Sequence, residues 1–235
     1  MLNPFDFSIL RFLNQYSQRS PLFDSLVVHV VYNLFLTGGL ITALLWWGWS
    51  RETPRRETNR AHVLAGLVLT VFALVVARGL ALILPFRVRP RFSESLAFRT
   101  PLGSESSYLI HWSSFPSDHA VMYFSLATAL FFISRRVGIF AYCHAVFVVC
   151  LPLLYLGVHY PTDVIAGAFL GIAIASLARI DSVRDAIAGP GLRWRRHSSA
   201  TFYPAIYLFT LLVATEFDSV REIVADIWRA MKGLS

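Results

Sequence analysis

The most reactive pair of side chains in this 235-residue sequence is His159 and Asp163, in the segment YLGVHYPTDVIAG at 155–167. If Pro161 opens a helix that His159 just precedes, the Asp163 carboxylate can approach the imidazole ring. A carboxylate bound to one ring nitrogen fixes the tautomer and leaves the other nitrogen as a nucleophile. The aspartate also lies among aliphatic residues, where a carboxylate needs a partner. The spacing therefore predicts a nucleophilic histidine oriented by an aspartate.

A second histidine lies in the segment SSFPSDHA at 113–120, immediately before an apolar run. Proline, serine and aspartate are common at helix starts, and capping alone would explain them. The same geometry directs free backbone N–H groups and the positive end of the helix toward an anion. His119 would lie in the first turn, where it can donate a proton to a leaving oxygen. Ser117, Asp118 and His119 are therefore candidates for an anion-binding helix start with an acid catalyst.

Three arginines alternate in the segment PFRVRPRF at 85–92, where another apolar run ends. A helix does not continue comfortably through Pro90, so these side chains lie at a helix end. One interpretation is that they snorkel to a membrane interface. The other is that Arg87 or Arg89 binds phosphate, since a guanidinium suits bidentate contacts. Arg78 interrupts the apolar run itself, and an ionisable side chain there indicates a specific partner.

The elements that position these segments are apolar runs long enough to cross a membrane. Hydrophobic residues make up 56% of the chain and charged residues only 15%, against roughly 25% charged residues in an ordinary soluble domain. A helix of about 20 residues crosses a hydrocarbon core about 30 Å thick. The sequence therefore predicts an all-α, polytopic membrane helix bundle with six spans, near 22–49, 61–86, 119–133, 139–157, 160–178 and 200–216. If the spans alternate in direction, the three segments meet on one side of the bilayer.

Further segments flank or stabilise this bundle. Residues 1–20 mix aromatic and aliphatic side chains with polar ones, which predicts an amphipathic helix in the membrane interface. Residues 21–180 form the predicted transmembrane core, and 181–235 combine a basic loop, the sixth span and a tail. Within the core, Gly167 and Gly171 form a small-xxx-small pattern that favours close packing of helices.

The formal net charge of +7 comes largely from arginines in the short loops between apolar runs. Because these residues do not form one basic face, the charge indicates membrane topology and not nucleic-acid binding. Once the arginines of 85–92 are set aside, most of the others lie in 51–60, 135–136 and 179–196. Basic loops stay in the cytoplasm. We therefore expect a multi-pass protein of the inner (plasma) membrane, with both termini and the candidate site facing the periplasm or the exterior.

The three segments together resemble those of a known family. PFRVRP, FPSDHA and LGVHYPTDVIAG, in this order and each at a span boundary, resemble the three signature segments of the type 2 phosphatidic acid phosphatases. The resemblance covers roughly residues 60–180, and FPSDHA together with HYPTD is highly specific. The aspartate in FPSDHA is similar to that of the undecaprenyl-pyrophosphate phosphatases of the bacitracin-resistance type. The span at 200–216 looks like an addition to that pattern.

The resemblance implies a role for each matching residue. His159 would attack phosphorus and form a phosphohistidine, Asp163 would orient it, and His119 would protonate the leaving lipid oxygen and later activate water. The phosphoryl oxygens would be held by Arg89, Ser117 and the N–H groups around Asp118. No metal and no cofactor are implied. The implied partners are a lipid phosphate substrate and the surrounding membrane lipids.

Two positions depart from the family pattern. Where the family has a lysine before the arginine of its first segment, this chain has Leu82, and where it has an arginine before the histidine of its third, this chain has Leu153. Arg78 and Arg87 lie near enough in sequence to replace the missing cations. Arg78 would have to reach against the tilt of helical side chains, which in this span point away from the site.

Three functions remain compatible with these residues. The first is a lipid phosphatase that removes the terminal phosphate of a polyprenyl pyrophosphate or another lipid phosphate. The second is a phosphotransferase, in which a sugar or lipid hydroxyl captures the phosphoryl group in place of water. The third is a non-catalytic membrane protein on the same fold, which accounts for the two leucines but leaves the histidines and the aspartate without a purpose. The sequence favours the phosphatase.

Overall fold

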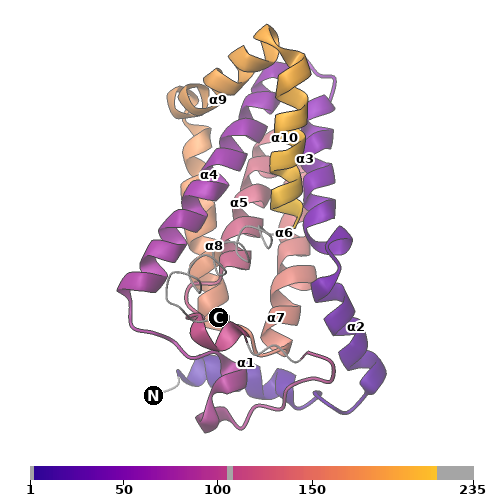
Figure 1. Cartoon of the computed structure of the whole chain (residues 1–235), viewed down its shortest axis with the longest axis vertical. Coiled ribbons are helices and arrows are strands. Elements are labelled where there is room, and N and C mark those ends of the chain that lie inside the picture. Colours follow the sequence, from indigo (N-terminus) through magenta and orange to yellow (C-terminus); the bar gives the residue numbers. More distant parts are fainter. Residues whose placement is uncertain (1–2, 105–107, 216–235) are drawn as a thin grey trace, which may run out of the picture.

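The computed structural model describes residues 3–104 and 108–215, and over these residues the chain forms helices joined by loops. The longer helices are α1 (Pro4–Asn14), α2 (Pro21–Tyr32), α3 (Leu40–Ser50), α4 (Arg56–Ile83), α5 (Asp118–Ile133), α6 (Arg135–His144), α7 (Leu151–Tyr155), α8 (Pro161–Ala175), α9 (Asp181–His197) and α10 (Ser199–Ala214). In Figure 1, α3, α4, α5, α8 and α10 run along the long axis of the molecule. The same view shows α1 lying across one end of this bundle and α9 at the other.

Three helices in the described part of the chain are long and apolar enough to cross a membrane. They are Arg56–Ile83, which is α4, Arg135–Tyr155, which contains α6 and α7, and Pro161–Arg179, which extends α8. A bent pair, Pro21–Tyr32 with Phe35–Ser50, is a fourth candidate. Two more apolar helices, α5 and α10, are shorter, with 16 residues each. The all-helical membrane fold is confirmed at this level, and the number of six spans stays a prediction.

The first predicted span, 22–49, is bent. Its two halves meet at an angle of 56°, with a π-helical turn opening the second half. The Asn33 side chain accepts hydrogen bonds from Phe35 N at 3.1 Å and from Leu36 N at 3.0 Å. It thereby satisfies the first amides of the second half. His144 Nε2 donates a hydrogen bond to the Leu36 carbonyl at 2.7 Å, so the break is also held from α6.

The central helix of the bundle is α5, on which α4, α6 and α8 all pack. A Cβ atom added at Gly167 would lie 2.5 Å from the Ser117 carbonyl oxygen, and one at Gly171 would lie 2.4 Å from the Val121 carbonyl oxygen. Larger residues would therefore force α8 away from α5. The predicted packing role of this glycine pair is confirmed, and it brings the starts of the two helices together.

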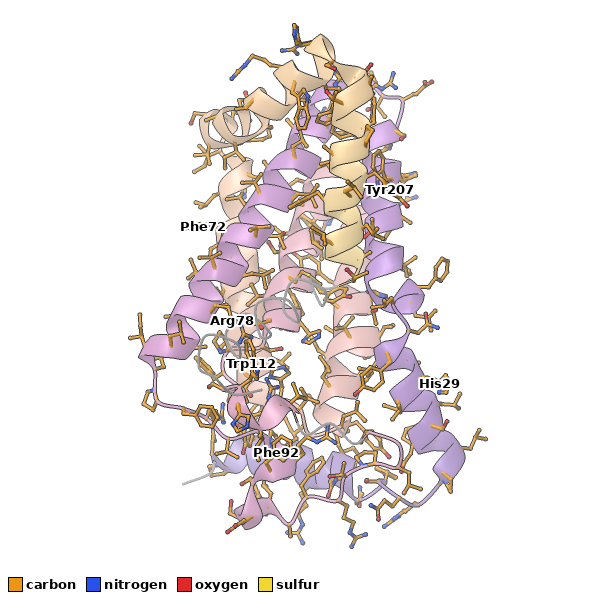
Figure 2. The ribbon with its side chains drawn as sticks, in the orientation of Figure 1. His29, Phe72, Arg78, Phe92, Trp112 and Tyr207 are labelled. Atoms are coloured by element: carbon orange, nitrogen blue, oxygen red, sulfur yellow. The ribbon has the colours of Figure 1, made fainter. Side chains whose placement is uncertain are left out.

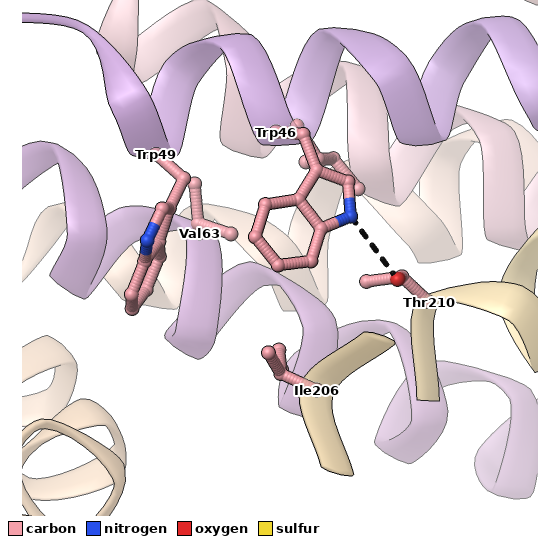
Figure 3. Close-up of a pocket in the computed structure, with 6 residues that line it drawn as sticks. Trp46, Trp49, Val63, Ile206 and Thr210 are labelled. Carbon is pink, nitrogen blue, oxygen red and sulfur yellow. Dashed lines mark hydrogen bonds between the residues drawn. The ribbon is translucent and has the colours of Figure 1, made fainter. Parts of the chain in front are cut away.

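The last described helix, α10, packs along α3 in the region shown in Figure 3. Trp46 Nε1 donates a hydrogen bond to Thr210 Oγ1 at 3.2 Å. Trp49, Val63 and Ile206 line the same narrow crevice between the helices. Since none of the residues that line it is ionisable, this contact serves the packing of the added helix.

The segment after residue 180, predicted as a basic loop, is helical and forms α9. Asp181 lies in its first turn and three basic residues lie in its last turn, an arrangement that complements the helix dipole. Arg195 pairs with Glu57 at 2.8 Å, and a Cβ atom added at Gly191 would lie 3.0 Å from Leu64. Packing on α4 therefore keeps this polar segment helical. The predicted tail at 216–235 lies outside the described residues.

The N-terminal helix α1 combines exposed aromatic side chains with one buried charge. Phe5 and Phe12 are exposed, as an amphipathic interfacial helix requires, and the position of this helix in a membrane interface stays a prediction. Asp6, however, is fully buried. The helix contacts α7 and α8, which lie on either side of His159. It is therefore packed against the end of the bundle where the candidate site lies.

Candidate active site

Backbone hydrogen bonds join the three predicted segments at the α1 end of the bundle. Ser114 N donates to the Arg87 carbonyl at 2.9 Å, which links the second segment to the first. Ser117 N donates to the Asp163 carbonyl at 3.1 Å, which links the second segment to the third. The prediction that the segments lie at the same end of the bundle is therefore confirmed.

The two histidines face each other across this junction. His119 lies in the first turn of α5 and His159 lies just before α8, with 6.2 Å between their ring centroids. The Ser117 side chain caps α5 by accepting a hydrogen bond from Ala120 N at 3.4 Å. The positive end of α5 therefore opens beside both imidazole rings.

The tautomer of His159 is set by a backbone carbonyl and not by the predicted aspartate. His159 Nδ1 lies 2.9 Å from the Ser114 carbonyl oxygen. Because a carbonyl only accepts, Nδ1 carries the hydrogen and Nε2 keeps its lone pair. Asp163 Oδ2 lies 3.8 Å from Nδ1, beyond hydrogen-bond distance, and accepts from Tyr160 N at 2.7 Å. Asp163 thus acts on the ring as a nearby charge.

His159 is also held in its neutral form. It lies in the loop between the candidate spans that end at Tyr155 and begin at Pro161. Burial lowers the pKa of His159 to about 4, and the nearby Asp163 carboxylate raises it too little to offset this. The charge of Arg89 contributes to the same lowering of the pKa. A neutral ring with a free Nε2 is the form that a nucleophile requires.

Arg89 is buried and binds the loops around His159. Its Nε donates to the Trp112 carbonyl at 3.2 Å and its Nη1 to the Val158 carbonyl at 2.9 Å. Its Nη2 lies 3.5 Å from the Ser113 carbonyl oxygen. This guanidinium therefore fixes the segment before α5 against the residue that precedes His159, and it brings a positive charge to the site.

Arg87, predicted to hold phosphate, has a different role. Its Nη1 donates to Thr162 Oγ1 at 2.9 Å and pairs with Asp163 Oδ1. Its Nη2 pairs with Asp6 at 2.7 Å, and its guanidinium lies 4.0 Å from the centre of the Tyr160 ring. The substrate-binding prediction for Arg87 is therefore not supported, because two carboxylates already engage its fork.

Asp6 is a site residue that the sequence did not identify. It is 0% exposed and reaches Thr162 and Arg87 from α1. Its partners are 156 and 81 residues away along the chain, so no local spacing relates them. The sequence pattern placed Asp6 among the polar residues of an interfacial helix, and nothing in that pattern separates it from a solvated residue.

Arg78 does reach the site in spite of the tilt of its helix. It pairs with Asp118 at the start of α5, and its guanidinium lies 5.3 Å from the centre of the Trp112 ring (Figure 2). Its side chain therefore reaches against the tilt of its helix, as a replacement cation would have to do. Arg78 approaches within one residue of His119 and is a cation of the site.

The two leucines occupy different environments. Leu82 is 87% exposed near the end of α4, on the outer surface of the bundle. Leu153 is 3% exposed and packs in the hydrophobic core. Arg78, Arg87 and Arg89 each contact residues of the candidate segments through their side chains.

The tautomer of His159 gives a testable prediction. Nitrogen-15 NMR of histidine-labelled protein should show a hydrogen on Nδ1 and none on Nε2, unchanged from about pH 8 to about pH 5, because the pKa of about 4 keeps the ring neutral over this range. The variant His159→Gln identifies the signal. Protonation near pH 6.5, or a hydrogen on Nε2 alone, would contradict the geometry.

Comparisons with known proteins point to one family. Residues 62–184 match the PAP2 superfamily. The bacitracin transport permease protein BcrC of Bacillus licheniformis is 29% identical over 169 residues, which cover 70% of this chain and 74% of that protein. Undecaprenyl-diphosphatase BcrC of Bacillus subtilis is 23% identical over 176 residues, which cover 73% of this chain and 81% of that protein.

A solved structure aligns with a similar share of this chain. The crystal structure of Aquifex aeolicus LpxE aligns with a TM-score of 0.49 and 26% identity, over 73% of this chain and 93% of that one. The family match spans more than half of the chain and contains all three segments of the candidate site. The chain therefore belongs to the PAP2 superfamily, the type 2 phosphatidic acid phosphatases that its segments resemble.

Proposed function

We propose that this protein hydrolyses the terminal phosphate of a lipid pyrophosphate, of the undecaprenyl pyrophosphate type, through a phosphohistidine on His159. The observation that carries the proposal is the free Nε2 of His159, opposite His119 and beside the start of α5. A relative that bears the name undecaprenyl-diphosphatase supports the substrate class. The membrane lipids that surround the bundle are the other partners.

In the first step, His159 Nε2 attacks the terminal phosphorus while the bond from phosphorus to the bridging oxygen breaks. A protonated His119 donates its proton to that oxygen, so the lipid monophosphate leaves without building up charge. The ring of His159 becomes cationic as the N–P bond forms. Asp163, 3.8 Å from Nδ1, stabilises that charge.

In the second step, His119 accepts a proton from water as the water oxygen attacks the phosphohistidine. The N–P bond breaks, inorganic phosphate leaves, and both histidines return to their starting forms. The same pair of rings serves both steps because the acid of the first becomes the base of the second. The proposal requires no metal or cofactor.

Three sources of positive charge stabilise the negative phosphoryl oxygens. The start of α5 at Asp118 presents the positive end of the helix dipole beside the two imidazole rings, where a helix binds anions. Arg89 supplies a second positive charge, which its hydrogen bonds to loop carbonyls hold in place. Arg78 is paired with Asp118 before substrate binds, and phosphoryl oxygens take the place of this carboxylate. Arg78 thereby replaces one of the two cations that are missing at the leucine positions.

The topology follows from the location of the site. We place the α1 end of the bundle at the periplasmic or exterior face of the inner membrane, with six spans and α9 in the cytoplasm. The basic last turn of α9 and the arginines at 51–60 then lie together on the cytoplasmic side, as basic loops do.

Transfer to an alcohol differs from hydrolysis only in the second step. The observation that favours it is the buried Leu153, which leaves the site one cation poorer than the family pattern. A sugar or lipid hydroxyl would then take the place of water. Release of phosphate in the absence of any added alcohol would argue for hydrolysis.

Purified protein should release phosphate from undecaprenyl pyrophosphate faster than from phosphatidate or phosphatidylglycerophosphate. His159→Ala should lower turnover by about 10³-fold or more, since loss of the nucleophile removes the covalent route. The matched control is His144→Ala, which removes another buried histidine, one that bonds to the Leu36 carbonyl, and should leave turnover per folded molecule unchanged. Retention of more than about a tenth of wild-type turnover by His159→Ala would refute the nucleophile.

The role of Arg78 is tested against a second arginine that lies over a tryptophan. Arg78→Ala should reduce turnover by about 10²-fold, as loss of one fixed donor does in other enzymes. Arg51 lies 5.2 Å from the centre of the Trp47 ring at the opposite end of the bundle, so Arg51→Ala is the matched control and should retain turnover. If Arg78→Ala lowers only the melting temperature, with turnover per folded molecule intact, Arg78 joins helices and does not bind phosphate.

The topology is tested by cysteine labelling in spheroplasts, in a variant without Cys143 and Cys150. A cysteine at exposed Ser95, near the site, should react with a membrane-impermeant thiol reagent, whereas one at exposed Thr58 should not. Labelling at position 58 with none at 95 would place the reaction in the cytoplasm.

A further inference from the structure

The N-terminal helix α1 places a fully buried carboxylate beside the reaction centre. Asp6 is 0% exposed, and burial of a charge is costly unless it is paired and hydrogen-bonded. Asp6 Oδ1 accepts from Thr162 N at 2.9 Å, and Oδ2 accepts from Thr162 Oγ1 and from Arg87 Nη2, each at 2.7 Å. These side-chain hydrogen bonds go to residues next to the candidate site.

Arg87 connects this carboxylate to a second one. Its Nη2 binds Asp6, and its Nη1 binds both Thr162 Oγ1 and Asp163 Oδ1. The Tyr160 ring lies 4.0 Å from the guanidinium and restricts its orientation. With Asp6 in place, one planar guanidinium is shared between two carboxylates and its direction is fixed at both ends.

The position of Asp163 depends on this arrangement. Oδ1 is held by Arg87 and Oδ2 by Tyr160 N at 2.7 Å, which leaves Oδ2 3.8 Å from His159 Nδ1. The attacking ring becomes cationic, so its stability depends on the net negative charge that Asp163 presents. Arg87 reduces that charge, and Asp6 restores it by neutralising Arg87. Without Asp6, the arginine would interact with Asp163 alone.

We propose that Asp6 is a positioning residue that acts through Arg87 on Asp163, so that α1 is part of the reaction centre. The inference rests on the proposed function, because it concerns the cationic ring formed when His159 attacks phosphorus. It extends the site to a helix outside the three signature segments and outside the matched residues 62–184. Asp6 touches neither substrate nor the imidazoles.

The test compares two buried aspartates of the N-terminal region. Asp6→Asn should lower kcat by about 10- to 100-fold, the loss expected from a misplacement of about 1 Å, and leave KM within about twofold. Asp24→Asn is the matched control. Asp24 is also 0% exposed and accepts from Gln18 N at 3.0 Å and Leu102 N at 3.1 Å, away from Arg87. Both variants should lower the melting temperature, and only Asp6→Asn should lower kcat.

A double variant decides whether Asp6 acts through Arg87. If it does, Asp6→Asn with Arg87→Gln should lose no more kcat than Arg87→Gln alone. Multiplicative losses would overturn the proposal, as would full kcat in Asp6→Asn beside an active wild type. If Asp6→Asn does not fold, Thr162→Val removes the hydroxyl shared by Asp6 and Arg87, and a kcat equal to wild type would then overturn it. Absence of phosphate release by the wild type itself would instead overturn the proposed function and this inference with it.

Discussion

The rest of this site depends on the interactions that stabilise the buried carboxylate of Asp163. Moving one carboxylate out of water costs several kcal/mol unless its surroundings compensate. The start of α8 contributes its helix dipole and the amide of Tyr160, and Arg87 contributes a full charge. Each compensating group brings a segment with it, so the end of α4, the start of α8 and the N-terminal helix are all held around the same charge.

The arginines illustrate how one residue type performs different tasks at a membrane boundary. Arg89 donates to backbone carbonyls and fixes loops, whereas Arg87 lies between two carboxylates. Arg78 pairs with Asp118, in a position that a substrate anion can also occupy. Sequence alone shows three guanidinium groups near one helix end. Their partners separate them into loop support, charge balance and candidate phosphate binding.

The sequence was sufficient to predict that the three candidate segments lie together at one end of the bundle, because the helix starts at Asp118 and Pro161 follow from local rules and ionisable residues are rare in apolar spans. It was not sufficient for contacts between distant segments. The carbonyl of Ser114 replaces Asp163 as the partner of His159 Nδ1, and no side-chain pattern encodes a backbone acceptor. Asp6 was not identified because its partners lie 156 and 81 residues away along the chain. The bend at Asn33 was not predicted because a side-chain cap interrupts an otherwise continuous apolar run. The helix α9 was not predicted because packing on α4 stabilises a segment that is rich in charged residues.

We propose that His159 attacks through Nε2 because the Ser114 carbonyl holds Nδ1. The most direct measurement is to mix the protein with a substrate labelled in its terminal phosphate, quench rapidly in alkaline detergent, and map the labelled residue by mass spectrometry and comparison with the two phosphohistidine isomers. We expect the label on His159, in the isomer phosphorylated at Nε2, and we expect acid treatment to remove it. Label at Nδ1, on His119 or on a residue other than histidine would contradict this proposal.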